Sequence, residues 1–259
     1  MSVPVVATLL RSPAARAGLR RSLPRGRVRL VACRSVAALE RCVATRLVDA
    51  VVVDARLPGA AAGLVRLRER FPGVPRFAYA AFRPDDADLL VTCVHAAGAH
   101  PIVEGVEDAV AWDLILPRTA SALRLGALEG APRILRLVDR LQLLAWHEVV
   151  HGVAGPLRTA AIAGALGVSR EHLSRQFGAG GAPNLKRVID LARTATAADL
   201  LASPGYSVRA VAAILGFASA SHLAGAARRI AGVTARRLPE LGPRGVLAAF
   251  VRGRTRSRV

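Results

Sequence analysis

Aromatic side chains are scarce in this chain, at 4% of its 259 residues. Proteins that bind RNA usually stack bases on exposed aromatic side chains, so the scarcity argues against an RNA-binding role. Cysteine is scarce as well: Cys33, Cys42 and Cys93 are odd in number and lack the spacing of metal ligands. We expect them to be reduced core thiols of a cytoplasmic protein.

Long apolar runs are also missing. No run reaches the roughly 18 residues that a membrane helix needs, and the N-terminus lacks the layout of a signal peptide. We therefore expect no membrane partner. Lysine is nearly absent too, because Lys186 is the only one, and the basic residues are almost all arginine.

A repeated segment is the most informative feature that is present. Residues 158–177 read RTAAIAGALGVSREHLSRQF and residues 207–227 read SVRAVAAILGFASASHLAGAA. Each copy has an apolar helical pattern, then Leu-Gly, an apolar residue, a small polar run and His-Leu. The repeat predicts two similar helical units, which we call the first head (158–177) and the second head (207–229).

The residue pattern of each head predicts two helices joined by a sharp turn. In the first head, apolar residues lie four apart on each predicted helix, Ile162 with Leu166 and Leu173 with Phe177. Gly167 stands at the turn, and Ser169 is a good N-cap for the second helix. In the second head, Gly216 and Ser219 take the same places. Each head is therefore expected to be a helix-turn-helix.

Residues 184–202 between the heads lack Gly and Pro and keep an apolar stripe. A helix of this length spans roughly 28 Å, which approaches the roughly 34 Å between successive major-groove faces on one side of B-DNA. Two heads on one rigid helix could therefore engage adjacent grooves as a monomer.

With these pieces, residues 145–242 resemble the DNA-binding domain of AraC-type (AraC/XylS) bacterial transcription regulators. The resemblance is carried by the first head and by matching residues further along, namely Arg193, Ala197, Leu200, Leu201, Gly216, Phe217, Ser221, Gly232, Val233 and Thr234. Three positions depart from the family pattern, since Leu223 and Ala227 stand where Phe is usual and Ala235 stands where Pro is usual. We therefore expect the second head to be thinner and less tightly packed than is usual in the family.

The resemblance implies sequence-specific binding of double-stranded DNA for transcriptional control, with RNA polymerase as a further partner. The expected base-reading residues are Arg170, His172, Ser174, Arg175, Gln176, Ser219 and His222. The expected phosphate contacts are Ser169, Arg209, Ser221, Arg228 and Arg229. The first head has the longer polar side chains, so we expect it to read the sequence and the second head mainly to hold the backbone.

The charge distribution agrees with a nucleic-acid partner. Residues 158–259 contain 16 basic and 4 acidic residues, whereas residues 1–115 contain 16 and 11. An excess of arginine on the part with the two heads is what neutralisation of phosphates requires. Residues 243–259 are rich in arginine, and we expect a disordered tail there.

Residues 1–115 show a different pattern of predicted elements. Short β-rich runs alternate with helical stretches, and the runs lie at 3–10, 27–32, 49–54, 75–80 and 100–103. The helical stretches are expected at 13–23, 35–46, 61–71, 84–97 and 107–116. Such alternation predicts a parallel sheet covered on both faces. The whole chain is therefore expected to be multidomain, with a flavodoxin-like α/β part followed by an all-α part.

The segment VVVDARLPG at 51–59 resembles the phosphoacceptor loop of response-regulator receiver domains, with Asp54 at the phosphoacceptor position. Receivers also use an acidic pair for Mg²⁺, a Thr or Ser, and a Lys. Here Leu10 and Arg11 align with the acidic pair, Ala80 with the Thr, and Glu104 or Gly105 with the Lys. We therefore expect a degenerate receiver-like domain in which Asp54 is a vestige. As a hypothesis, Arg11 pairs with Asp54.

The expected domains are a receiver-like domain at 1–115, a helical linker at 116–150, the DNA-binding domain at 151–242 and the tail at 243–259. The N-terminal domain could serve dimerisation, bind the linker, or bind a ligand or protein. In the linker, residues 131–150 place apolar side chains on one stripe, Ile134, Leu137, Val138, Leu141, Leu144 and Ala145. This stripe could pack on its own chain or on a second copy.

One other motif points to a different class of protein. His147, Glu148 and His151 form an H-E-x-x-H sequence, which on a helix is the arrangement of zinc proteases, and Glu171 has the spacing of a third ligand. However, Glu171 falls within the recognition helix of the first head. A metalloprotease and a phosphorylation-dependent regulator acting through Asp54 remain as alternatives. Our main expectation is a regulator without catalytic residues, metal or cofactor.

Overall fold

The structure is a computed structural model that describes residues 3–24, 26–81, 83–105, 110–154 and 157–256. The chain divides into two compact parts. The N-terminal domain comprises Val3–Leu123 with Ser203–Gly205, and the C-terminal domain comprises Arg124–Ala202 and the residues from Tyr206 onward.

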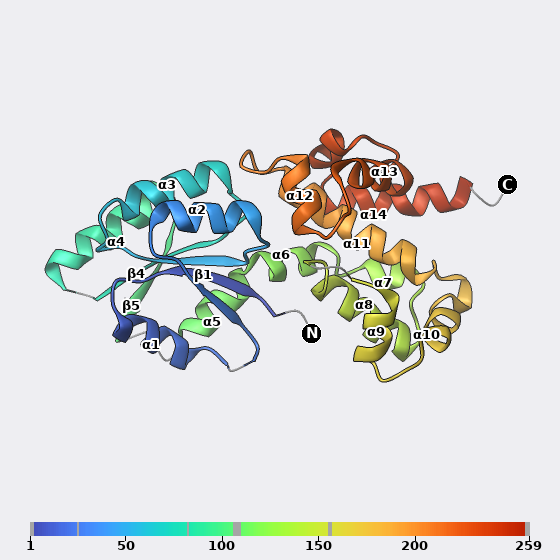
Figure 1. The fold of residues 1–259 in the computed structure, drawn as a ribbon, viewed down its shortest axis with the longest axis horizontal. Coiled ribbons are helices and arrows are strands. Elements are labelled where there is room, and N and C mark those ends of the chain that lie inside the picture. The colour runs from blue at the N-terminus through green and yellow to red at the C-terminus, as the bar shows by residue number, and fades with distance from the viewer. Residues whose placement is uncertain (1–2, 25, 82, 106–109, 155–156, 257–259) are drawn as a thin grey trace. The chain divides into compact units, whose positions relative to one another are not determined.

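The N-terminal domain is built on a parallel five-stranded sheet (Figure 1). Its strands are β1 (Val5–Leu9), β2 (Arg29–Ala32), β3 (Ala50–Asp54), β4 (Arg76–Ala81) and β5 (His100–Glu104). They lie in the order β2-β1-β3-β4-β5, which is the order of flavodoxin-like folds. All residues of the central strand β3 are buried, because its Ala-Val-Val-Val run is covered on both faces.

Helices cover both faces of the sheet. Helices α1 (Pro13–Ser22) and α5 (Ala111–Ile115) lie on one face, and α2 (Val36–Thr45), α3 (Ala60–Arg70) and α4 (Pro84–Ala97) lie on the other (Figure 1). Side chains of α1 and α5 such as Leu19 and Ile115 form one core with Val52 and Tyr79 of the sheet. These elements confirm the receiver-like α/β expectation. Residues 107–109 of the helix expected at 107–116 lie outside the described residues.

The rest of the described chain is helical. Its helices are α6 (Ala120–Ala127), α7 (Ala131–Ile134), α8 (Arg140–His151), α9 (Thr159–Ala165), α10 (Arg170–Phe177), α11 (Leu185–Leu201), α12 (Val208–Ile214), α13 (Ala220–Ala231) and α14 (Leu238–Arg256). Helix α11 is the centre of the domain, with most of its side chains buried. Within the described residues, no helix combines the length and the apolar composition that a membrane crossing requires.

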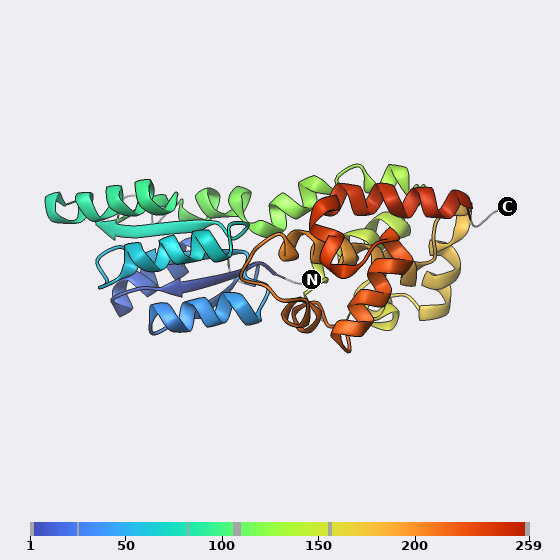
Figure 2. The same ribbon diagram turned by 90° about the horizontal axis from the view of Figure 1, so that it is seen from above.

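The arginine-rich C-terminal segment differs from the expected disordered tail. Helix α14 continues to Arg256, with one break at Gly242, which has a φ of 61°. The reason is an apolar face on this helix, because Val246, Leu247 and Phe250 are buried. Helix α14, drawn in red in Figures 1 and 2, packs against α11 and α13.

The apolar stripe expected along residues 131–150 is interrupted. Helix α7 ends at Ile134, α8 begins at Arg140, and Arg136 between them has a φ of 58°. This left-handed conformation is uncommon for a residue with a Cβ atom. Leu137 and Ala145 are buried within their own domain, whereas Val138 is 81% exposed. The stripe is therefore split between an inner and an outer face.

Candidate nucleic-acid interface

The first head folds as a helix-turn-helix made of α9 and α10. Gly167 at the turn has a φ of 67°, a conformation that glycine adopts without strain. The Val168 N–H donates to the Ala163 carbonyl (3.0 Å), which closes the turn. The Ser169 hydroxyl accepts from the His172 N–H (3.1 Å) and caps α10.

The second head repeats this geometry with α12 and α13. Gly216 has the same φ of 67°, and the Ser219 hydroxyl accepts from the His222 N–H at 3.1 Å. Leu223 and Ala227 are fully buried despite standing where the family usually has Phe. Both positions are therefore in the core, and α13 packs against α11, α12 and α14. That this head packs less tightly than is usual in the family stays a prediction.

Helix α11 connects the two heads. Its 17 residues span about 25 Å. Arg193 on this helix donates from Nη2 to the Leu157 carbonyl just before the first head (3.2 Å). Its guanidinium also lies 5.8 Å from the ring centroid of Phe217 in the second head. Burial lowers the pKa of Arg193. One side chain of the connecting helix thus contacts the residue that precedes the first head and the Phe217 ring of the second head.

The expected base-reading residues all lie at the surface. Those of the first head are on the exposed face of α10 or at its end, while Leu173 and Phe177 on the opposite face are buried. Ser219 and His222 are exposed at the start of α13. At the N-terminus of α10 and of α13, exposed polar side chains therefore lie beside the capping serine. In helix-turn-helix proteins, the N-terminal residues of the recognition helix contact base edges.

The expected phosphate contacts are also exposed, with different partners inside the protein. The Arg209, Ser221 and Arg228 side chains are at the surface of the second head. Arg229 lies 3.6 Å from the Asp190 carboxylate of α11 while its side chain stays 61% exposed. The Ser169 hydroxyl already caps α10, so a phosphate there would share its hydroxyl with the helix.

The Asp54 carboxylate in the N-terminal domain is held by an arginine, although not by the one expected. Arg56 donates from Nε to Oδ1 (2.8 Å) and from Nη2 to Oδ2 (2.9 Å). Arg11 contributes only its backbone N–H (3.1 Å to Oδ2), so the hypothesis of an Arg11 side-chain pair is wrong. The reason is distance along the loop: Arg56 follows Asp54 by two residues and its own N–H also donates to Oδ1 (3.1 Å).

Arg56 is shared with two further carboxylates. Its Nη1 lies 2.8 Å from Glu104 on β5 and 3.8 Å from Asp86 on α4. The hydrogen bonds that Arg56 donates to Asp54 and the nearby negative charges raise the pKa of Arg56 above its ordinary value. A fixed guanidinium therefore lies among acidic side chains at the end of the sheet where receiver domains hold a metal cation.

The H-E-x-x-H motif lies on α8. The ring centroids of His147 and His151 are 4.1 Å apart, and His147 Nδ1 lies 3.9 Å from the Glu148 carboxylate. In the part of the chain that the structure describes, no group of three His, Cys, Asp or Glu side chains is placed to hold a metal ion. Glu171 is on the exposed surface of α10. The motif therefore forms a histidine pair without the third ligand that its spacing suggested.

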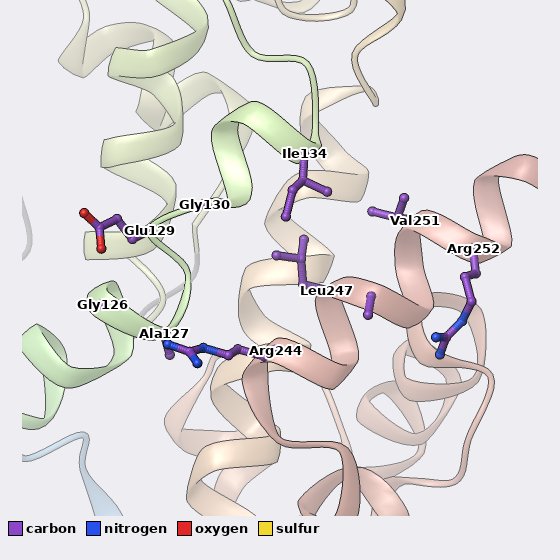
Figure 3. A pocket seen from close by; sticks show the side chains of 10 residues that line it. Gly126, Ala127, Glu129, Gly130, Ile134, Arg244, Leu247, Val251 and Arg252 are labelled. Carbon is purple, nitrogen blue, oxygen red and sulfur yellow. The ribbon is translucent and has the colours of Figure 1, made fainter.

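The C-terminal domain also contains a mostly apolar pocket of about 770 Å³ between α14 and residues 126–134. The Ile134, Leu247 and Val251 side chains point toward one another across it, and Arg244 reaches toward Ala127 (Figure 3). Ile134 of the interrupted stripe is 49% exposed here. Ile134, an exposed residue of the predicted stripe, therefore lines this pocket.

A family model described as a helix-turn-helix domain matches residues 162–239. No curated protein matches the chain significantly. Among solved structures, the signal receiver domain of an HD domain-containing protein from Pseudomonas fluorescens Pf-5 is 20% identical, with a TM-score of 0.39, over 48% of this chain and 86% of that one.

Two further solved structures, one of them of full-length FixJ, are similar at the same level. FixJ from B. japonicum is 14% identical, with a TM-score of 0.41, over 88% of this chain and 97% of that one. The Salmonella typhimurium response regulator RcsB is 17% identical, with a TM-score of 0.34, over 67% and 88%. These TM-scores are too low to assign a fold. The fold of the N-terminal domain is therefore assigned from the order and the register of its strands. Residues 162–239 form an AraC-type helix-turn-helix domain, which follows a receiver-like domain in the same chain.

Proposed function

We propose that this chain is a transcriptional regulator that binds a specific sequence of double-stranded DNA with its two heads in neighbouring major grooves. The observation that supports this most directly is the pair of capped, exposed recognition helices α10 and α13 on the single helix α11. The span of α11, about 25 Å, suits sites about one turn of DNA apart.

The two heads divide the work in this proposal. On α10, Arg170, His172, Arg175 and Gln176 read base edges, because Arg pairs well with guanine and Gln with adenine in the major groove. Ser174, Ser219 and His222 make shorter-range base contacts. The backbone is held by Ser169, Arg209, Ser221, Arg228 and Arg229 together with the helix N-termini.

The experiment is selection of bound sequences from a random double-stranded library, followed by affinity measurements on the full chain. Arg175→Ala is expected to relax the preference at one position and to cost about 1–3 kcal/mol on the selected site. Arg228→Ala is expected to weaken binding to all sequences alike. Arg68→Ala, an exposed arginine of the N-terminal domain, is the matched charge control. Equal losses for both variants on selected and random DNA would refute the division of work.

We also propose that the N-terminal domain acts without phosphate, through dimerisation or through a ligand or protein signal that reaches RNA polymerase. The support is the bidentate bond of Arg56 to the fully buried Asp54 carboxylate, which engages both carboxylate oxygens. Incubation with acetyl phosphate and Mg²⁺, followed by mass spectrometry, is expected to show no phosphoryl group on Asp54. Stoichiometric labelling that Asp54→Asn abolishes would restore the phosphorylation-dependent alternative.

A further inference from the structure

Gln142 is a polar side chain in α8 that is only 1% exposed. Its Oε1 accepts hydrogen bonds from the backbone N–H groups of Val138 (2.9 Å) and Asp139 (3.0 Å). With the Asp139 carboxylate, which accepts from the Leu141 N–H (2.8 Å), it forms a capping box at the start of α8. One end of the Gln142 amide thus fixes the chain that leads into α8.

The other end of the same amide bonds to the end of the first recognition helix. Gln142 Nε2 donates to the carbonyls of Phe177 (2.9 Å), Ala179 (3.2 Å) and Gln176 (3.4 Å). The last carbonyls of a helix have no partner within the helix. Here a buried side chain from another helix supplies the donor.

A second side chain lies near the same two segments. Arg136, with its left-handed φ of 58°, precedes α8, and its Nη1 lies 3.7 Å from the position that a Cβ atom on Gly181 would take. Residues 136–142 and residues 176–181 therefore meet through a buried amide and have a guanidinium close by.

Helix α10 needs such a support because it is short. It has eight residues and buries only Leu173 and Phe177. A helix of about two turns gains little stability by itself, so its orientation depends on tertiary contacts. Loss of the amide donor would leave the buried Phe177 carbonyl without this partner.

We propose that Gln142 is the positioning residue that ties the segment before α8 to the first recognition helix and thereby sets the affinity of the first head for DNA. This inference rests on the proposed function. Any partner or signal that displaces residues 138–142 would weaken sequence reading by α10, because the same amide holds both segments. Gln142 itself touches no DNA in this proposal.

The test uses Gln142→Glu in the full chain. A glutamate at this position keeps the oxygen that accepts from Val138 and Asp139, and Glu is a usual partner in a capping box. It removes the donor to the end of α10 and brings a negative charge to the negative end of that helix. The matched control is Leu143→Glu, which adds the same carboxylate one residue later on a side chain that is 42% exposed.

We expect Gln142→Glu to lower affinity for the selected DNA by about tenfold or more, as the loss of a buried hydrogen-bonded partner would. Leu143→Glu should stay within about twofold of the wild type, as most exposed substitutions do. Amide hydrogen exchange of residues 170–181 should be faster in Gln142→Glu, while exchange in α13 is unchanged. A general loss of stability would raise exchange in both heads.

Two outcomes would overturn the inference: wild-type DNA affinity of Gln142→Glu, or unchanged exchange of residues 170–181. If Gln142→Glu does not fold, Gln142→Met keeps the side-chain length without the amide and is compared in the same way. A wild-type chain that selects no sequence would instead refute the proposed function. The exchange comparison needs no DNA, so it still decides whether Gln142 holds α10.

Discussion

Replacement of Arg56 by methionine gives the sharpest prediction for the N-terminal domain. The substitution keeps an unbranched side chain and removes the guanidinium. Asp54 is 0% exposed and, among the residues that the structure describes, would retain two backbone donors, the N–H groups of residues 11 and 56. Breaking a buried ion pair by removing one partner costs about 3–5 kcal/mol. Because the Arg56 side chain is 17% exposed, we expect the lower end, about 3 kcal/mol.

The assay is urea unfolding of the full chain followed by tryptophan fluorescence. The chain has two tryptophans, Trp112 in the N-terminal domain and Trp146 in the C-terminal domain. Trp112 lies on α5 and packs against the core that α1 and α5 form with the sheet. A Trp146→Phe background therefore reports the N-terminal domain alone.

A double-mutant cycle with Asp54→Asn separates the pair from other effects. The coupling between Arg56 and Asp54 should be about 2–3 kcal/mol, well above the 0–1 kcal/mol of exposed pairs. The control is Arg66→Met, because Arg66 is 50% exposed and pairs with Glu40 at 2.8 Å. If Arg56→Met and Arg66→Met cost the same, Arg56 does not act as a buried cation and the reasoning fails.

Three further predictions concern other parts of the chain. Arg136→Gly should stabilise the C-terminal domain by up to about 1 kcal/mol in urea unfolding, because a left-handed residue with a Cβ atom is strained; a loss would show that its side-chain contact matters more. Phe250→Ala should destabilise that domain by about 3–5 kcal/mol, since Phe250 is 1% exposed; no change would mean that α14 does not pack. The side-chain interaction with Cys33 lowers the pKa of the Cys42 thiol below its ordinary value, so its thiolate forms at lower pH than a free cysteine's. Alkylation of Cys42 followed by mass spectrometry should rise at lower pH in the wild type than in Cys33→Ser, and identical pH profiles would contradict it.

Much of the fold could be predicted because its signals are local. In both heads, a glycine at the turn and a serine two or three residues later define the helix ends, so the boundaries follow from neighbouring residues. The alternation of apolar strands and helices in the first 115 residues predicted the parallel sheet in the same way. Strand ends such as Asp54 could be placed because a buried Val-Val-Val run stops there.

The parts that were missed depend on contacts between distant residues. The pairing of Arg56 with Glu104 requires two neighbouring strand ends of the folded sheet, although Arg56 is close enough to Asp54 in sequence to have been considered. Gln142 and Phe177 are 35 residues apart, and nothing in the local pattern joins them. The prediction of a disordered tail at residues 243–259 was wrong because it rested on the many arginines there. It overlooked the apolar residues, such as Phe250, that form the buried face of α14.

Contacts between distant helices also bury the small side chains of the second head. Leu223 and Ala227 of α13 are fully buried, and α13 packs against α11, α12 and α14. The C-terminal segment is therefore part of the structure that holds the second head. Deletion of residues 243–259 is a poor way to test phosphate contacts, since it would also remove this packing.

Selection of bound sequences from a random double-stranded DNA library measures directly whether this chain reads DNA with two heads. A two-headed regulator should enrich one site with two conserved blocks whose centres lie about 10 base pairs apart. The block read by α10 should be the more strictly conserved, and Arg175→Ala should relax that block alone. Recovery of no preferred sequence, or of a single short block that Arg175→Ala leaves unchanged, would contradict a regulator that reads DNA with two unequal heads.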